Sequence, residues 1–262
     1  MTVADDALTE IARLLRTCER VVWLTGAGLS VASGLSPYRK AGDAVWSRFI
    51  TDWGTIERFH ESPAAWWREF WLKAHADLAR ANTVRPNAGH DAITRIVTKK
   101  PAHLVVTQNI DGLHRVSGVP EQQLVEIHGR HDRFICTRAG CARVQEPLTS
   151  VDLSRVDEDI APRCDLCGEP LRPLVLLFDE TYDSHPAYRM REARRALNDA
   201  EVIVFVGTSF SVGITDYATR AGRYARARLV NVNVEPMGDG DVLDLLGPAE
   251  VTLPQLVVAA RL

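Results

Sequence analysis

Two pairs of cysteines stand close together in the middle of this 262-residue chain. Cys136 and Cys141 enclose four residues, Cys164 and Cys167 enclose two, and 22 residues separate the pairs. Thiolates at this spacing can bring four sulfurs to one tetrahedral zinc, and an all-cysteine site is closed and structural. The alternative is four free thiols. In a reducing compartment the clustering indicates a metal site more than disulfides.

A glycine-rich turn follows a short apolar run near the start of the chain. Residues 21–24 are predicted to form a buried strand of a parallel sheet, and they lead into Gly26-Ala27-Gly28. Two glycines let the backbone turn sharply and approach a ligand. Such a turn, opening a helix, directs N–H groups at a pyrophosphate, and Ser30 can add a hydroxyl donor. A tight turn without a ligand is the alternative. Val31 stands where the dehydrogenase fingerprint has a third Gly or Ala, so this is not the ordinary version of that motif.

Polar side chains follow four further predicted strands, at 103–107, 124–127, 201–206 and 228–234. The carboxyl ends of parallel strands are where α/β sheets bind ligands. An Asp-Gly turn would explain Asp111, but it does not explain the two polar residues before it. For His128, a structural histidine is the alternative. The side chains are Gln108, Asn109 and Asp111 after the first strand, His128 after the second, Thr208 and Ser209 beside Gly207 after the third, and Asn233 and Glu235 at the end of the fourth.

Helices are expected around these strands, because apolar residues recur there at helical spacing. Residues 36–58 are poorly periodic and are predicted to form a long loop, although Trp46, Phe49 and Trp53 argue against disorder. Residues 171–178 are expected to form another apolar strand. The expected helices cover 4–20, 63–80, 89–99, 185–200, 214–225, 241–246 and 253–262.

The overall composition is ordinary for a soluble globular protein, with 46% apolar and 25% charged residues. A net charge of −3 gives no reason to expect nucleic acid or an anionic membrane as a partner. No apolar run approaches the roughly 20 residues that span a bilayer. The acidic N-terminal segment lacks the basic and apolar regions of a signal peptide, so a cytoplasmic protein is expected.

In their order and spacing these motifs resemble the sirtuin family of NAD-dependent protein deacylases, over nearly the whole chain. The resemblance implies an α/β fold, with a Rossmann-like parallel sheet flanked by helices and a small zinc-ribbon plus helical module. It places the NAD-binding domain at 1–35, 86–130 and 171–262, the cofactor loop and helical module at 36–85, and the four-cysteine ribbon at 131–170. The segments that carry it are GAGLSVASGLSPYR, TQNIDGLH, EIHG, the two cysteine pairs, VGTS and VNVEP.

The resemblance also implies roles for individual residues, with NAD consumed as a co-substrate and one zinc serving structure. His128 would be the general base on the ribose hydroxyls, and Asn109 would be the second catalytic residue; His114 receives no catalytic role. The acyl-lysine peptide would contact Val175, Phe178 and Glu180. The implied NAD contacts are Gly26, Ala27, Gly28, Ser30, Arg39, Gln108, Asn109, Asp111, Gly207, Thr208, Ser209, Asn233, Glu235 and Ala249.

The implied reaction frees the lysine and forms nicotinamide and O-acyl-ADP-ribose. Two departures from the family pattern bear on its substrate. Asp179 stands where members often have the Gly of Phe-Gly-Glu, in the segment that would pair with the peptide. Arg68 lies in the early helix, but no Tyr precedes it at the Tyr-x-x-Arg spacing of desuccinylating members. We therefore expect acetyl or another neutral acyl group.

Two other classes of function fit parts of the pattern. An NAD glycohydrolase or mono-ADP-ribosyltransferase could use the same fold, and its products would distinguish it, because only a deacylase forms O-acyl-ADP-ribose. A non-catalytic NAD-sensing or zinc-ribbon binding protein is a third possibility, against which the presence of His128 and Asn109 argues.

Overall fold

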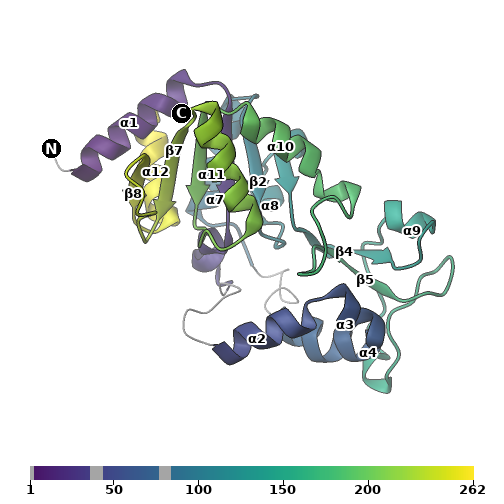
Figure 1. Ribbon diagram of the computed structural model, residues 1–262. Helices are drawn as coiled ribbons and strands as arrows, with labels where there is room; N and C mark the ends of the chain where they lie inside the picture. The colour runs from purple at the N-terminus through teal and green to yellow at the C-terminus, as the bar shows by residue number, and fades with distance from the viewer. Residues whose placement is uncertain (1–2, 36–43, 77–83) are drawn as a thin grey trace. The chain divides into compact units, whose positions relative to one another are not determined.

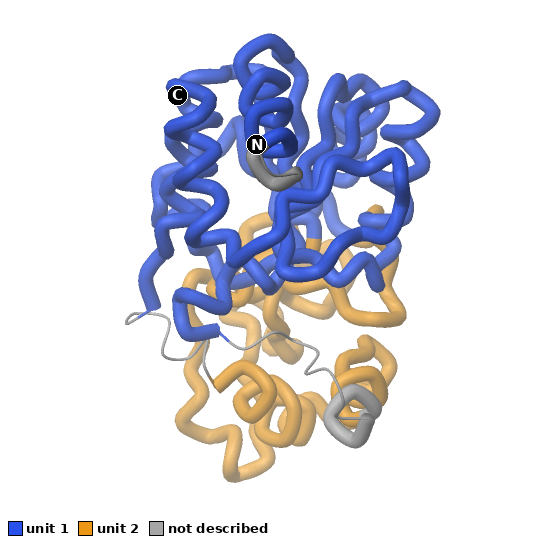
Figure 2. Tube along the Cα trace, turned by 90° about the vertical axis from the view of Figure 1, so that its left-hand side faces the viewer, with its two compact units in different colours: residues 1–37, 84–127, 185–262 blue, residues 38–83, 128–184 orange. Residues whose placement is uncertain are grey.

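The computed structural model describes residues 3–35, 44–76 and 84–262. Its Cα trace divides into two compact units (Figure 2): unit 1 contains 1–37, 84–127 and 185–262, and unit 2 contains 38–83 and 128–184. Residues 171–184, expected in the NAD-binding domain, therefore fall in unit 2. The reason is that strand β5 (Leu171–Val175) pairs antiparallel with β4 (Gly129–Cys136) of the same unit.

Unit 1 is built on a parallel sheet of six strands in the order β3-β2-β1-β6-β7-β8. This is the 3-2-1-4-5-6 order of a Rossmann sheet, and it confirms the Rossmann-like parallel sheet that the resemblance implied. Every residue of β1, β2 and β6 is buried, which is why these strands are nearly continuous apolar runs. The strands are β1 (Val21–Thr25), β2 (Leu104–Thr107), β3 (Leu124–Glu126), β6 (Val202–Val206), β7 (Arg228–Asn233) and β8 (Val242–Leu246).

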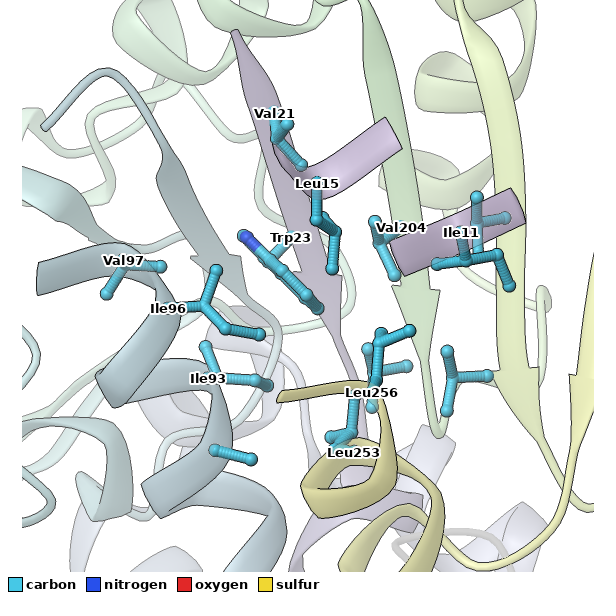
Figure 3. Close-up of a cluster of buried hydrophobic side chains, with 14 of the residues drawn as sticks. Ile11, Leu15, Val21, Trp23, Ile93, Ile96, Val97, Val204, Leu253 and Leu256 are labelled. Atoms are coloured by element: carbon cyan, nitrogen blue, oxygen red, sulfur yellow. The ribbon is translucent and has the colours of Figure 1, made fainter. Parts of the chain in front are cut away.

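Helices cover both faces of this sheet (Figure 1). On one face α1, α7 and α12 pack Leu15, Ile93 and Leu253 against Trp23 of the central strand (Figure 3). On the other face α11 places Gly222 against Ile203, where a Cβ would lie 2.9 Å from the isoleucine side chain. The helices of unit 1 are α1 (Val3–Thr17), η1 (Ala27–Ser33), α7 (Ala88–Lys99), α8 (Leu113–Val116), η3 (Glu121–Gln123), η5 (Pro186–Tyr188), α10 (Met190–Asn198), α11 (Gly213–Ala225) and α12 (Ala249–Ala260).

Unit 2 combines short helices with the antiparallel pair β4–β5 and a core of aromatic side chains. Trp66, Trp67 and Phe70 are almost fully buried, and the Trp67 indole N–H donates to the Leu171 carbonyl at 2.9 Å. These aromatic side chains are core. The helices are α2 (Ala44–Trp53), α3 (Ile56–Glu61), α4 (Pro63–Ala65), the π-helical η2 (Trp66–Trp71), α5 (Leu72–Ala74), α9 (Ala142–Gln145) and η4 (Val156–Glu158).

The long loop predicted for residues 36–58 is wrong where the structure describes it, because α2 and α3 occupy most of 44–61. The missed signal is the spacing of Trp46, Phe49, Ile50 and Trp53, which is that of one helix face. Thr55 then begins α3 as its N-cap, accepting from the Arg58 N–H at 3.1 Å.

Other predicted elements also differ from the structure. Residues 242–246 form strand β8 rather than a helix, because a short apolar run fits either element and here it pairs with β7. The helix expected at 185–200 is broken at Arg189, whose φ is 49°. The last helix begins at Ala249 and includes Pro254. Among the described residues, no helix combines the length and apolar character needed to cross a bilayer.

Candidate functional site

Two turns at the carboxyl edge of the unit 1 sheet, at residues 26–28 and at Gly207, are in direct backbone contact. The Gly28 N–H donates to the Gly207 carbonyl at 2.8 Å, and the Gly26 N–H donates to the Val206 carbonyl at 2.9 Å. A Cβ on Gly207 would lie 2.4 Å from the Leu29 nitrogen, and one on Gly26 would lie 2.8 Å from the Gly207 oxygen. These glycines are therefore required by the contact between the turns, whatever ligand they bind.

Asn109, Ser30 and Asp111 form a hydrogen-bonded cluster beside the first of these turns. The Asn109 amide donates to the Gly26 carbonyl at 3.0 Å and to the Ser30 hydroxyl at 3.2 Å. Ser30 donates to Asp111 at 2.7 Å, and the other carboxylate oxygen of Asp111 accepts from the Leu113 N–H at 2.9 Å. Asn109 is only 9% exposed, so its amide is held in one orientation by these partners.

Gln108 and Asn233 bind Thr208, which follows Gly207, to the ends of the neighbouring strands. The Gln108 amide donates to the Thr25 carbonyl and to the Thr208 hydroxyl, both at 3.3 Å. Asn233, at the end of β7, donates to the Thr208 carbonyl at 2.9 Å. The structure therefore brings together polar residues that the sequence placed at the ends of β1, β2, β6 and β7.

Other predicted NAD contacts have partners or surroundings of their own. Ser209 bonds to the Ser211 hydroxyl at 2.7 Å, and Glu235 is exposed. Ala249 is buried at the start of α12, where a Cβ on Gly89 would lie 3.3 Å from its carbonyl carbon. Arg39 lies outside the described residues.

Two buried histidines lie near this cluster, and the sequence did not predict that they would pair. His90 and His114 have ring centroids 5.1 Å apart, and the His114 Nε2 lies 3.0 Å from the Thr25 hydroxyl. Burial lowers the pKa of His90, against a smaller opposing effect of Asp111. Burial also holds the pKa of His114 well below its usual value. Both pKa shifts favour the neutral form of these imidazoles. The sequence signal was the final His of TQNIDGLH, which received no role.

The four cysteines of unit 2 converge on one point, with their sulfurs within 4.8 Å of one another. Cys136 and Cys167 are 3.4 Å apart and Cys141 and Cys164 are 3.7 Å apart. A zinc bound tetrahedrally at about 2.3 Å places its sulfurs about 3.8 Å from one another, so the geometry fits one structural zinc.

Glycines and one ion pair support the two cysteine pairs. Gly140 and Gly168 both have a positive φ, and a Cβ at either would have no atom within 4 Å, so they serve the tight turns alone. The Arg143 guanidinium binds both oxygens of Asp165, at 2.9 and 2.6 Å, and so joins the segments that carry the two pairs.

His128 follows directly after Ile127, which extends β3, and it begins the second segment of unit 2, residues 128–184. Its carbonyl accepts from the Leu176 N–H at 2.9 Å, which fixes its backbone to the end of β5. Its imidazole is partly exposed and stacks on the ring of Tyr182. The side chain is thus accessible and held in place from within its own unit.

The residues predicted to contact the peptide follow from the same strand. Val175 is buried at the end of β5, and Phe178 is 49% exposed. The Glu180 carboxylate is bound by Arg172 at 2.6 Å and by the Leu177 N–H at 3.0 Å. Its carboxylate is therefore engaged within the protein, where it stabilises the turn that carries Phe178.

Asp179, the departure from Phe-Gly-Glu, has a structural function in this chain. Its two carboxylate oxygens accept from the backbone N–H groups of Ile56 and Glu57, at 2.7 and 3.1 Å. The Phe178 N–H donates to the Gly54 carbonyl at 2.9 Å. Together these bonds attach the segment after β5 to the start of α3.

Arg68, the second position of interest for the acyl group, is bound to other groups of unit 2. Its guanidinium contacts Glu69 at 2.9 Å, the Val156 carbonyl at 3.3 Å and Asp159 at 3.5 Å. These partners already compensate its charge.

Comparison with known proteins agrees with this fold. Residues 26–214 match the family model of the Sir2 family. The NAD-dependent deacetylase sir2E of Dictyostelium discoideum is 35% identical, over 94% of this chain and 75% of that protein. NAD-dependent protein deacylase 2 of Pseudomonas aeruginosa is 33% identical over 97% of each chain. A solved structure from a study of the mechanism and regulation of Sir2 enzymes superposes with a TM-score of 0.77 at 27% identity, over 98% of each chain.

Proposed function

Because the chain belongs to the Sir2 family, we propose that it is an NAD-dependent protein-lysine deacetylase that transfers the acyl group to ADP-ribose and releases nicotinamide. The observation that carries this proposal is the Asn109–Ser30–Asp111 cluster at the ends of β1 and β2. It presents fixed amide, hydroxyl and carboxylate groups beside two glycine turns, which suits a polar dinucleotide. Relatives of nearly full-length coverage carry the names deacetylase and deacylase.

NAD supplies an electrophilic anomeric carbon once nicotinamide can leave. The proposed tasks of this chain are to bind, orient and deprotonate. The pyrophosphate is held by Gly26, Ala27, Gly28 and Ser30, and Arg39 is proposed to close over the cofactor. The ribose and the carboxamide are oriented by Asn109 and Asp111, with Gln108 as a further contact. Gly207, Thr208, Ser209, Asn233, Glu235 and Ala249 hold the adenosine portion. The bonds among Gln108, Thr208 and Asn233 support this assignment, because they order these groups in advance.

His128 is the proposed general base, which takes a proton from a ribose hydroxyl. An imidazole is suited to this task, since its unperturbed pKa of about 6.5 leaves it largely unprotonated at neutral pH. The partial exposure of His128 supports the choice. His90 and His114 are buried, which leaves them poorly placed to exchange protons with a ligand.

The proposed substrate is a protein or peptide that carries an acetyl-lysine or another neutral acyl-lysine. It would lie against Val175, Phe178 and Glu180, at the end of β5. The contacts of Arg68 with Glu69 and Asp159 support a neutral acyl group, because an acidic one would have to compete with these carboxylates. The four cysteines hold zinc for structure, since a site with four thiolate ligands keeps no open position. The reduced state that these thiolates require supports a cytoplasmic location.

The proposed base is tested by comparing His128→Ala with His60→Ala, a substitution of an exposed histidine in the same unit. We expect His128→Ala to lower kcat for deacetylation by about 10²–10⁴-fold, with NAD and peptide affinity largely retained. His60→Ala should keep near wild-type turnover. Nearly normal turnover of His128→Ala would show that the base has been assigned to the wrong residue.

The glycohydrolase or mono-ADP-ribosyltransferase alternative is not favoured. The relatives that cover most of this chain include proteins named deacetylase or deacylase. The products formed from NAD and an acetyl-lysine peptide distinguish the alternatives for this chain.

A further inference from the structure

His128 has a close aromatic neighbour in unit 2. The rings of His128 and Tyr182 have centroids 5.8 Å apart and planes inclined by 21°, an offset stack. The Tyr182 hydroxyl lies 3.4 Å from the His128 Nε2. One residue therefore contacts both the face and one nitrogen of this imidazole.

Two consecutive hydrogen-bonded turns, at residues 177–180 and 181–184, fix the backbone position of Tyr182. Arg172, in β5, and Glu180 form an ion pair at 2.6 Å whose side chains are only 7% and 11% exposed. Glu180 also closes the turn that begins at Leu177, through its backbone N–H and one carboxylate oxygen. Ser184 closes the next turn by donating to the Thr181 carbonyl at 2.9 Å. Tyr182 lies inside this second turn.

The backbone of His128 is fixed to the same segment. Its carbonyl accepts from the Leu176 N–H, one residue before the turn that begins at Leu177. His128 and Tyr182 are thus both attached through the backbone to the segment that follows β5. An imidazole attached by its backbone alone can still rotate about its last side-chain bond.

We propose that Tyr182 is a positioning residue for His128, which holds the imidazole in one of its two flip orientations. A flip would replace Nε2 by a ring carbon next to the hydroxyl and so lose the hydrogen bond. With its proton on Nε2, the imidazole donates to the Tyr182 hydroxyl and leaves the Nδ1 lone pair to take the ribose proton, so the bond to Tyr182 is kept before and after the transfer. This inference rests on the proposed role of His128.

The test compares Tyr182→Phe, which keeps the stack, with Tyr182→Leu, which removes both contacts. The matched control is Tyr224→Phe, because Tyr224 is 94% exposed. For zinc-loaded protein we measure kcat and peptide KM for deacetylation, together with the exchange of labelled nicotinamide into NAD. Exchange reports binding and nicotinamide departure, which precede the proton transfer to His128.

We expect Tyr182→Phe to lower kcat for deacetylation by about 2- to 10-fold, the effect of one hydrogen bond. Tyr182→Leu should lower kcat by about 5- to 100-fold, because the stacking contact is lost as well. Exchange and peptide KM should stay within about twofold of wild type. A rise in peptide KM at constant kcat would instead make Tyr182 a substrate contact. An equal fall of exchange and deacetylation would make it a merely structural residue. Either result overturns the proposal.

A double-mutant cycle separates this inference from the function it rests on. In a His128→Ala background, Tyr182→Phe should cause less than a twofold further loss, because the hydroxyl has no imidazole to hold. If His128→Ala itself keeps normal turnover, the proposed base fails. If His128→Ala shows the expected loss but the two losses multiply independently, only the role of Tyr182 fails.

Discussion

Gly207→Ala should separate the two turns on which the proposed NAD site is built. Gly207 has a φ of 57°, and an added methyl group would lie 2.4 Å from the Leu29 nitrogen and 2.7 Å from the Gly28 carbonyl carbon. Both neighbours are backbone atoms, so no side-chain rotation can relieve the overlap. The turns must move apart and lose the Gly28–Gly207 hydrogen bond.

The magnitude follows from comparing this position with Gly238, which has a φ of 73° and where an added Cβ would have no atom within 4 Å. Alanine at Gly238 should cost about 1–2 kcal/mol of stability, the cost of a left-handed backbone alone. Alanine at Gly207 should add the overlap, typically about 1–3 kcal/mol, for a total of about 2–5 kcal/mol.

The assay is chemical denaturation of both variants with zinc bound, together with NAD binding by calorimetry. Gly207→Ala should have the lower denaturation midpoint and much weaker NAD affinity, whereas Gly238→Ala should bind NAD like wild type. Equal midpoints and equal NAD affinity in the two variants would refute the reasoning, because the contact between the turns would then not shape the site.

Four further expectations concern zinc, the acyl group, Asp179 and pH. Metal analysis should find one zinc per chain, and Cys141→Ala should lose the metal and much of the folding free energy with it; zinc-free wild type that is folded and active would contradict this. The kcat/KM for an acetylated peptide should exceed that for the succinylated one; the reverse order would contradict this and point to Arg68 or Arg39 as the partner of the acidic acyl group. Asp179→Gly should lower the unfolding free energy by about 0.5–2 kcal/mol, because two capping bonds at α3 are lost; an unchanged denaturant melt would show that they contribute nothing. Burial lowers the pKa of His75 and His103 to about 4. The unfolded chain therefore binds more protons than the folded one between about pH 6.5 and 4, and the unfolding free energy should fall as the pH drops through that range. His103→Gln should make this dependence on pH less steep, and an unchanged dependence in denaturant melts would exclude His103 as its source.

The sequence was most informative where chemistry requires a residue type at a fixed spacing. The cysteine spacing predicted the cluster at 136–167, and polar residues after apolar strands predicted the groups that meet around Thr208. Both predictions depend on local rules: knuckle spacing for zinc, and the common edge reached by all parallel strands. They hold without knowledge of how distant segments pack.

The sequence was less informative where packing decides between two local structures. The apolar run at 242–246 became an edge strand because β7 lay beside it, with Asp244 accepting from Asn231 at 2.7 Å. The roles of Asp179 and Tyr182 depend on partners that lie more than fifty residues away along the chain. No pattern of composition or period encodes such pairs, so these contacts needed the structure.

The central claim is tested most directly by the products formed from NAD and an acetyl-lysine peptide, quantified by mass spectrometry. The proposed function predicts one nicotinamide and one O-acetyl-ADP-ribose for each lysine freed, and no freed lysine without NAD. Nicotinamide formed with plain ADP-ribose while the peptide stays acetylated, or with an ADP-ribosylated peptide, would contradict it.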